Sequence, residues 1–147
     1  METYALTFVY QRPALFTRTG NAELLVKVLF DYRDQGYYRL HGFAMLAKHL
    51  DVLLSPFPNR TIESCADCIK GDFADEALGR RFGMLRTRFP GAVWQPGFRE
   101  RFIRNAEDFR EQVGGIAADV EKLGLVDWGW VNSEFRDRLD PMPEWLR

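Results

Sequence analysis

The order of hydrophobic periodicities along the chain is the feature that most constrains its fold. Residues 4–10, 37–45 and 49–55 are short runs rich in apolar and aromatic side chains, which is typical of strands. The segments that follow Asn21, Thr61 and Asn105 place apolar residues at steps of three and four, which indicates helices. With a further candidate strand within residues 92–103, the predicted order is strand, helix, strand, strand, helix, strand, helix.

This order predicts an α+β fold, in which a ferredoxin-like antiparallel sheet carries helices on one face and is followed by a C-terminal helix. A chain of 147 residues with 46% hydrophobic side chains can bury one core but is short for two, so residues 1–147 are expected to form a single domain. Asn21 is the expected N-cap of the first helix, and Gly124 is expected to end the last helix. Gly71 and Gly115 weaken the second and the last helix respectively.

The charge of the chain is concentrated in one place. The net charge is −1, so no whole-molecule field favours nucleic acid, a membrane or an acidic ligand. Residues 79–104 nevertheless carry seven arginines against the single acid Glu100. This excess favours a local phosphate-binding patch over a solvated, acid-paired surface. The basic residues are Arg80, Arg81, Arg86, Arg88, Arg99, Arg101 and Arg104.

Aromatic side chains interleave with these arginines. Trp94 is a candidate for stacking on unpaired bases, whereas Phe98 and Phe102 are expected to pack in the core. Cys65 and Cys68 lie on one face of a predicted helix, where they are expected to be reduced, half-buried core residues rather than a metal or redox pair. Neither a signal-peptide pattern nor an apolar run of membrane-spanning length is present, which predicts a cytoplasmic protein without a membrane partner.

Four stretches, in the same order, resemble the REP-associated tyrosine transposases of the HUH superfamily, which act on single-stranded DNA. The stretches are TFVYQRPALF (Thr7–Phe16), YRLHGFAMLAKHLDVLLSP (Tyr38–Pro56), IKGDFA (Ile69–Ala74) with VWQPGFRERFIRNAEDF (Val93–Phe109), and GIAADVEKLGLVDWGW (Gly115–Trp130). The resemblance implies a partner that is single-stranded or hairpin DNA, and a homodimer as a candidate assembly. It also places Lys70 and Gln95 in contexts that contact DNA in the family.

The resemblance implies a cation site as well. Family members cut one strand with a tyrosine hydroxyl that attacks phosphorus, while a divalent cation polarises the phosphate. His49 and Asp51 stand where the family has two histidines, and Asp119 stands at the position of an auxiliary ligand. These ligands suit Mg²⁺ or Mn²⁺. The alternative is that His49 and Asp51 hydrogen-bond to each other at the sheet surface, and that Asp119 is simply solvated.

The nucleophile that this chemistry requires is missing. Gly115 stands at the family's tyrosine position, and all five tyrosines precede His49 in the chain. A glycine offers no hydroxyl, so tyrosine transposition is not expected and no catalytic residue is assigned.

Three hypotheses remain open from the sequence. The first is a catalytically inert, transposase-like protein that binds single-stranded or hairpin DNA. The second is a metal-dependent nuclease that uses His49, Asp51 and Asp119 to activate water. The third is a protein-interaction module that no longer binds DNA, suggested by the near-zero net charge and the C-terminal residues Trp128, Trp130 and Trp145.

Overall fold

A four-stranded antiparallel sheet forms the centre of the computed structural model, which describes residues 1–13, 19–79, 93–122 and 137–147. The strand order is β2-β3-β1-β4, so two crossover connections interleave as in a ferredoxin-like sheet. The strands are β1 (Tyr4–Val9), β2 (Tyr38–Met45), β3 (His49–Pro56) and β4 (Arg99–Phe102). The predicted α+β class and all four predicted strands are confirmed.

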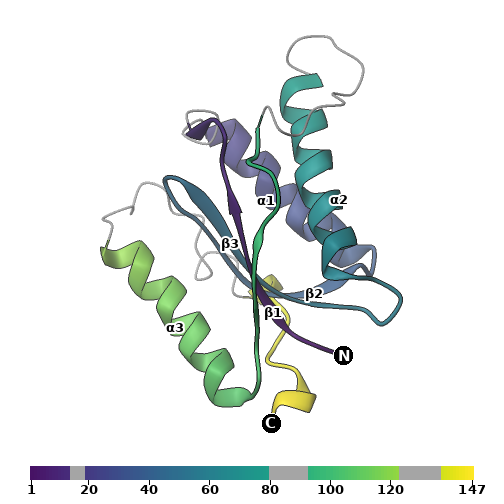
Figure 1. The fold of residues 1–147 in the computed structure, drawn as a ribbon, viewed down its shortest axis with the longest axis vertical. Coiled ribbons are helices and arrows are strands. Elements are labelled where there is room, and N and C mark those ends of the chain that lie inside the picture. Colours follow the sequence, from purple (N-terminus) through teal and green to yellow (C-terminus); the bar gives the residue numbers. More distant parts are fainter. Residues whose placement is uncertain (14–18, 80–92, 123–136) are drawn as a thin grey trace.

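The helices cover both faces of this sheet. On one face lie α1 (Thr19–Asp34) and α2 (Ile62–Ala74), which continues into the π-helical turn η2 (Asp75–Gly79). On the other face lies α3 (Ala106–Lys122), the predicted C-terminal helix (Figure 1). None of the helices in the described segments is long and apolar enough to cross a membrane.

The two faces hold separate hydrophobic clusters. Even-numbered residues of β1, such as Leu6 and Phe8, pack with α1 and α2 in the main core. Odd-numbered positions turn to the opposite face, where Leu53 packs with Phe109 of α3. This separation follows from the pleat, because successive side chains of a strand point to opposite faces. The face covered by α3 is called the α3 face below.

The helix ends show where the sequence was informative. Thr61 caps α2 at the predicted start of that helix. Its hydroxyl accepts a hydrogen bond from the Ser64 N–H at 3.0 Å, and the Ser64 hydroxyl accepts one from the Thr61 N–H. The prediction for Asn21 is wrong, because α1 is already helical at Thr19 and Asn21 lies inside its first turn. Both α2 and α3 continue through their glycines. Gly124 lies outside the described residues.

The cysteines are as expected. Cys65 and Cys68 are free thiols, buried and half-buried respectively. Burial is the main cause that raises the pKa of Cys65 to about 11, and it also raises the pKa of Cys68. Both side chains are therefore unreactive thiols of the core.

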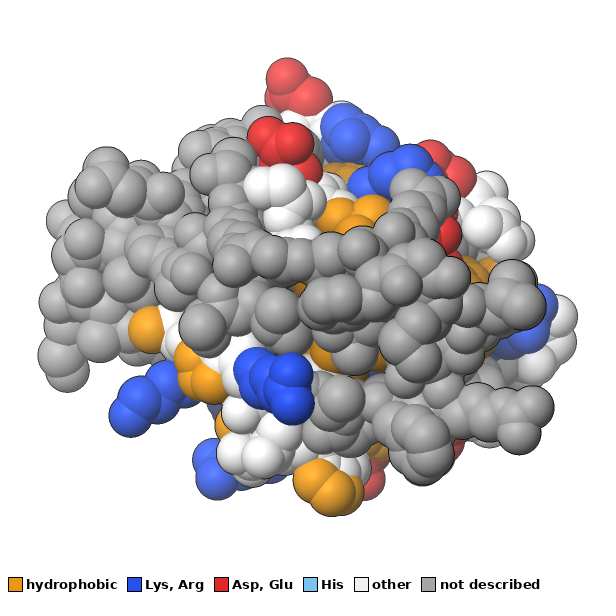
Figure 2. Space-filling view, turned by 90° about the horizontal axis from the view of Figure 1, so that it is seen from above, with side chains coloured by type: hydrophobic (Ala, Val, Ile, Leu, Met, Phe, Trp, Pro, Cys, Tyr) orange, Lys and Arg blue, Asp and Glu red, His pale blue; other side chains and the backbone are white. Residues whose placement is uncertain are grey.

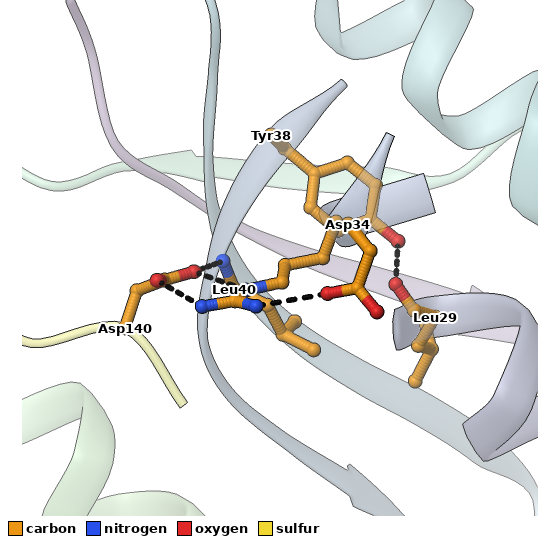
Figure 3. Close-up of polar contacts among 6 residues, drawn as sticks. Leu29, Asp34, Tyr38, Leu40 and Asp140 are labelled. Atoms are coloured by element: carbon orange, nitrogen blue, oxygen red, sulfur yellow. Dashed lines mark hydrogen bonds and ion pairs between the residues drawn. The ribbon is translucent and has the colours of Figure 1, made fainter. Parts of the chain in front are cut away.

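The C-terminal segment is fastened to β2, which is an edge strand, by one carboxylate. Asp140 accepts two hydrogen bonds from the Arg33 guanidinium, at 2.8 and 3.1 Å, and one from the Leu40 N–H at 2.8 Å (Figure 3). The Asp140 N–H donates to the Leu40 carbonyl at 2.7 Å, so the segment occupies part of the open edge of the sheet. Burial acts to raise the pKa of Asp140, but the hydrogen bonds from Arg33 and Leu40 outweigh it and lower that pKa.

We expect Asp140→Asn to destabilise the protein by about 1–3 kcal/mol, because charge-assisted hydrogen bonds to a guanidinium and to a backbone amide are lost. The measurement is urea unfolding at pH 7, with Asp34→Asn as control. Asp34 also pairs with Arg33, but its side chain is 54% exposed, and its loss should cost less than about 0.5 kcal/mol. Since the pKa of Asp140 is lowered in the fold, its contribution is present above the unfolded value of about 3.9 and is lost as the pH falls below it. Equal unfolding free energies for the two variants at pH 7 would contradict this role.

Candidate functional site

A row of side chains crosses the α3 face near the end of the sheet. The backbone register pairs Asp51 of β3 with Ala44 of β2 on one side and with Thr7 of β1 on the other. Thr7 in turn pairs with Arg99 of β4. Directly paired residues of antiparallel strands share a face, and neighbouring strands lie about 4.8 Å apart. Asp51, Thr7 and Arg99 therefore form one continuous line, called the polar row below.

The carboxylate of Asp51 contacts two neighbouring side chains of the α3 face. The Thr7 hydroxyl donates a hydrogen bond to Asp51 Oδ1 at 2.8 Å, and His49 Nε2 lies 3.4 Å from Asp51 Oδ2. The Asp51 side chain is 16% exposed and the His49 side chain is 35% exposed, so both can be reached from solvent. The predicted proximity of His49 and Asp51 on one strand face is thus present. Thr7 was not predicted, because its relation to Asp51 depends on a strand register that the sequence does not show.

The donor set suits a hard divalent cation only in part. An imidazole nitrogen and a carboxylate oxygen converge from alternate positions of one strand, as the chemistry requires. Within the described part of the chain, no group of three or more His, Cys, Asp or Glu side chains could hold a metal ion. Asp119 belongs to α3, but its side chain lies outside the described residues.

The position of Gly115 relates α3 to this row. At about 100° per residue, Gly115 falls within about 20° of Asp108 around the helix axis. Asp108 and Gln112 both bind Arg101, which follows Arg99 by two residues on the same face of the sheet. Gly115 is exposed, and a Cβ added there would meet nothing within 4 Å. The helix therefore turns this position toward the β4 side of the α3 face and leaves room for a side chain.

All five tyrosines lie on the opposite side of the sheet from the polar row, although Asp51 is near enough to contribute to the raised pKa of Tyr10. Tyr10 and Tyr38 are buried in the main core, on the face of α1 and α2, and the other three, Tyr4, Tyr32 and Tyr37, pack against that core. The Tyr38 hydroxyl donates to the Leu29 carbonyl at 2.6 Å (Figure 3), and burial raises its pKa well above the ordinary value. Burial likewise raises the pKa of Tyr10 and Tyr32. A hydrogen bond with Glu2 is the main cause that raises the pKa of Tyr4 to about 12.

The arginines of the basic segment differ in their partners. Arg101 donates to Asp108 at 2.5 Å and Arg104 lies 3.7 Å from the same carboxylate, which is only 4% exposed. Arg99 is exposed and forms no ion pair with any residue of the described segments. Arg80, Arg81, Arg86 and Arg88 lie outside the described residues. Figure 2 shows the molecule from the end toward which β1 runs. In this view Lys and Arg side chains lie beside hydrophobic ones, and most of the visible acidic side chains lie along one edge.

Two of the residues predicted to contact DNA have structural roles, and for Lys70 the contact with DNA stays a prediction. Trp94 is 1% exposed and packs between Tyr10 and Phe73, so the expectation that its ring stacks on bases is wrong. The Trp94 indole N–H donates to the Lys70 carbonyl at 3.1 Å. The Lys70 ammonium binds the carbonyls of Gln95 and Gly97, at 3.0 and 2.8 Å, and so holds the loop before β4.

The other predictions for this loop and for β4 have different outcomes. Gln95 is exposed and stays a candidate for contact with DNA. Phe98 packs against the main core as expected, with its ring 5.9 Å from that of Phe8. The expectation for Phe102 is wrong, because the ring is 49% exposed at the edge strand and touches Tyr4 only edge-on.

Comparisons with solved structures show that this fold is similar to that of two proteins described as transposases. The chain is similar to the structure of a REP-associated tyrosine transposase bound to a REP hairpin, with a TM-score of 0.68 and 20% identity over 95% of this chain and 82% of that one. It is also similar to a protein of Deinococcus radiodurans R1 that carries a provisional transposase assignment, with a TM-score of 0.56 and 19% identity over 81% of this chain and 91% of that one. No family model and no curated protein matches the sequence. The fold implied by the four stretches of sequence is confirmed.

The pairing of Asp108 makes a prediction about the arginines. Arg101→Ala should destabilise the protein by about 1–2 kcal/mol, because it removes the nearer partner of a buried carboxylate. Arg104→Ala should cost less than about 0.5 kcal/mol, since that side chain is 75% exposed and more distant. Urea unfolding at low salt measures both values. A larger loss for Arg104→Ala than for Arg101→Ala would contradict the assignment.

Proposed function

We propose that this protein is a transposase-like binder of single-stranded or hairpin DNA that lacks a tyrosine nucleophile. The observation that carries the proposal is the polar row on the α3 face, with Asp51, Thr7 and Arg99 side by side and no tyrosine on that face. The structural neighbour bound to a REP hairpin has the same fold over 95% of this chain, which supports DNA as the partner.

Among the arginines of the basic segment that the structure describes, Arg99 is the best suited to a phosphate. Its neighbours Arg101 and Arg104 are committed to Asp108, whereas Arg99 is exposed beside the Thr7 hydroxyl. The Thr7 hydroxyl uses its single proton in the hydrogen bond to Asp51, so the planar Arg99 guanidinium one strand away supplies the free donors for an anion. This arrangement supports a phosphate of the DNA backbone bound over Thr7.

The proposed cation site adjoins that phosphate position. His49 and Asp51 would hold Mg²⁺ or Mn²⁺, with Asp119 as a proposed third ligand, and Thr7 would orient the Asp51 carboxylate through its hydrogen bond. A bound cation would supply charge neutralisation for the phosphate. The donors of this chain then act in binding and orientation, because Gly115 offers no group to attack phosphorus.

Binding is expected to depend on Arg99. Arg99→Ala should weaken the affinity for a DNA hairpin and reduce the slope of log K against log salt by about 1, as expected when one phosphate contact is lost. Lys27→Ala is the matched control, since it removes one positive charge from an exposed position of α1, on the other face of the sheet. Fluorescence anisotropy over a salt series gives both quantities. Absence of hairpin binding to the wild-type protein at low salt, or equal slopes for all three proteins, would overturn the proposal.

The wild-type protein should form no covalent adduct with DNA. Incubation with hairpin-bearing single strands and Mn²⁺, followed by a denaturing gel, is expected to return intact and unattached DNA. A protein–DNA adduct would contradict the loss of the nucleophile. Cleavage without an adduct that is stimulated by Mn²⁺ and vanishes in Asp51→Ala would establish the nuclease hypothesis instead, because the cation would then activate water.

A further inference from the structure

One arginine, Arg39, lies over two aromatic rings at the far end of the α3 face, and this group of three side chains is called the stack below. Arg39 of β2 pairs with Ser55 of β3, so it belongs to the face of the polar row but lies four residues of β3 away from Asp51. Its guanidinium carbon is 5.8 Å from the centre of the Phe57 ring and 5.6 Å from the centre of the Trp145 ring. Both distances are within the range of a cation–π contact.

The guanidinium in this stack keeps its hydrogen-bonding capacity. A cation–π contact occupies none of the N–H donors of arginine, because the rings offer a face of π electrons rather than a hydrogen-bond acceptor atom. Arg39 forms no ion pair with any residue that the structure describes, and its donors are not committed to a carboxylate there. An anion approaching the edge of the stack would meet a preorganised, planar donor.

A cavity of about 420 Å³ opens beside the stack. Its walls include Arg39, Trp145, Met142 and Arg147, with Glu144 as the single acid against two arginines. Trp145 is 38% exposed, and it is one of only three large hydrophobic side chains in the described segments that are exposed to this extent. The exposed ring of Trp145, with Arg39 and Arg147 in the same cavity wall, complements a ligand that is both flat and anionic.

Attachment of the C-terminal segment does not account for the exposed tryptophan. The segment is fastened by Asp140, which binds Arg33 and Leu40, and by Leu146, which is buried with Leu53 and Phe109. These contacts hold residues 140–147 against the sheet without Trp145. The exposed ring is therefore available to an external ligand.

We infer that this pocket binds an unpaired nucleotide of a single DNA strand, with the base on Trp145 and the phosphate on Arg39 and Arg147. The inference rests on the proposed function, since it adds a second contact to the DNA bound at the polar row. The two contacts lie at opposite ends of one sheet face, so substitutions at one leave the other intact.

The experiment compares three DNA probes by fluorescence anisotropy at one salt concentration. The probes are a blunt hairpin, the same hairpin extended by unpaired thymidines, and an unstructured oligothymidylate. The extension should tighten binding to the wild-type protein by about tenfold, which is the effect of stacking one base on an aromatic side chain. Trp145→Ala and Arg39→Ala should each abolish this gain and leave the dissociation constant of the blunt hairpin unchanged.

Conservative variants separate the pocket from a structural role of the same residues. Trp145→Phe should keep most of the gain because a ring remains, whereas Arg39→Lys should lose most of it because an ammonium lacks the planar donors. Melting temperatures that match the wild type show that the tail remains docked in each variant.

The outcomes distinguish this inference from the proposed function. A gain that persists in both alanine variants, or no gain in the wild type, overturns the pocket alone. If the blunt hairpin fails to bind and oligothymidylate binding depends on Trp145, the proposed DNA contact at the polar row is overturned and the inference about the pocket stands. Absence of binding to all three probes overturns both.

Discussion

The alternation of side chains in the two central strands is the constraint on which the rest of the structure depends. Even-numbered residues of β1 and β3, among them Phe8 and Val52, are buried against α1 and α2, so their sequence neighbours Thr7 and Asp51 must face α3. A slip of one residue in this register would bury the Asp51 carboxylate in the main core and expose leucines and valines to α3. The hydrophobic core therefore fixes the polar row, and the hydrogen bond from Thr7 to Asp51 adds the final orientation.

The strands and helices could be predicted because their signals are local. The residues that form the apolar stripe of α1 lie within a few positions of one another in the sequence, and so do the residues that form the Thr61 cap of α2. The polar row could not be predicted, because Thr7, Asp51 and Arg99 are joined only by the pairing of three separate strands. The role of Trp94 was missed for the same reason, since its ring fills a space bounded by Tyr10 and Phe73, distant in sequence.

The basic segment shows how tertiary contacts divide residues that look alike in the sequence. A buried carboxylate is costly unless it is paired, and Asp108 satisfies this requirement with the Arg104 backbone N–H and with Arg101. Arg101 holds β4 against the first turn of α3, and the Asp108 carboxylate offsets its charge, whereas Arg104 lies 3.7 Å from the same carboxylate and is 75% exposed. Arg99 has no such partner among the described residues, so its field remains available to a ligand. The excess of positive charge in the sequence thus overstates the charge that this part of the segment offers to an anionic ligand.

The proposed loss of a nucleophile need not disturb this fold. Gly115 is exposed, and no atom lies within 4 Å of where its Cβ would be, so a side chain at this position contributes little to packing. Two adjacent glycines weaken α3 by about 1 kcal/mol each relative to alanine. The helix is nonetheless continuous, because Phe109 and Ile116 anchor it to the sheet on either side of the glycines. Under the proposed function, one side of the helix supplies stability and the exposed side is where a nucleophile would stand, so a change there can end catalysis and leave the fold intact.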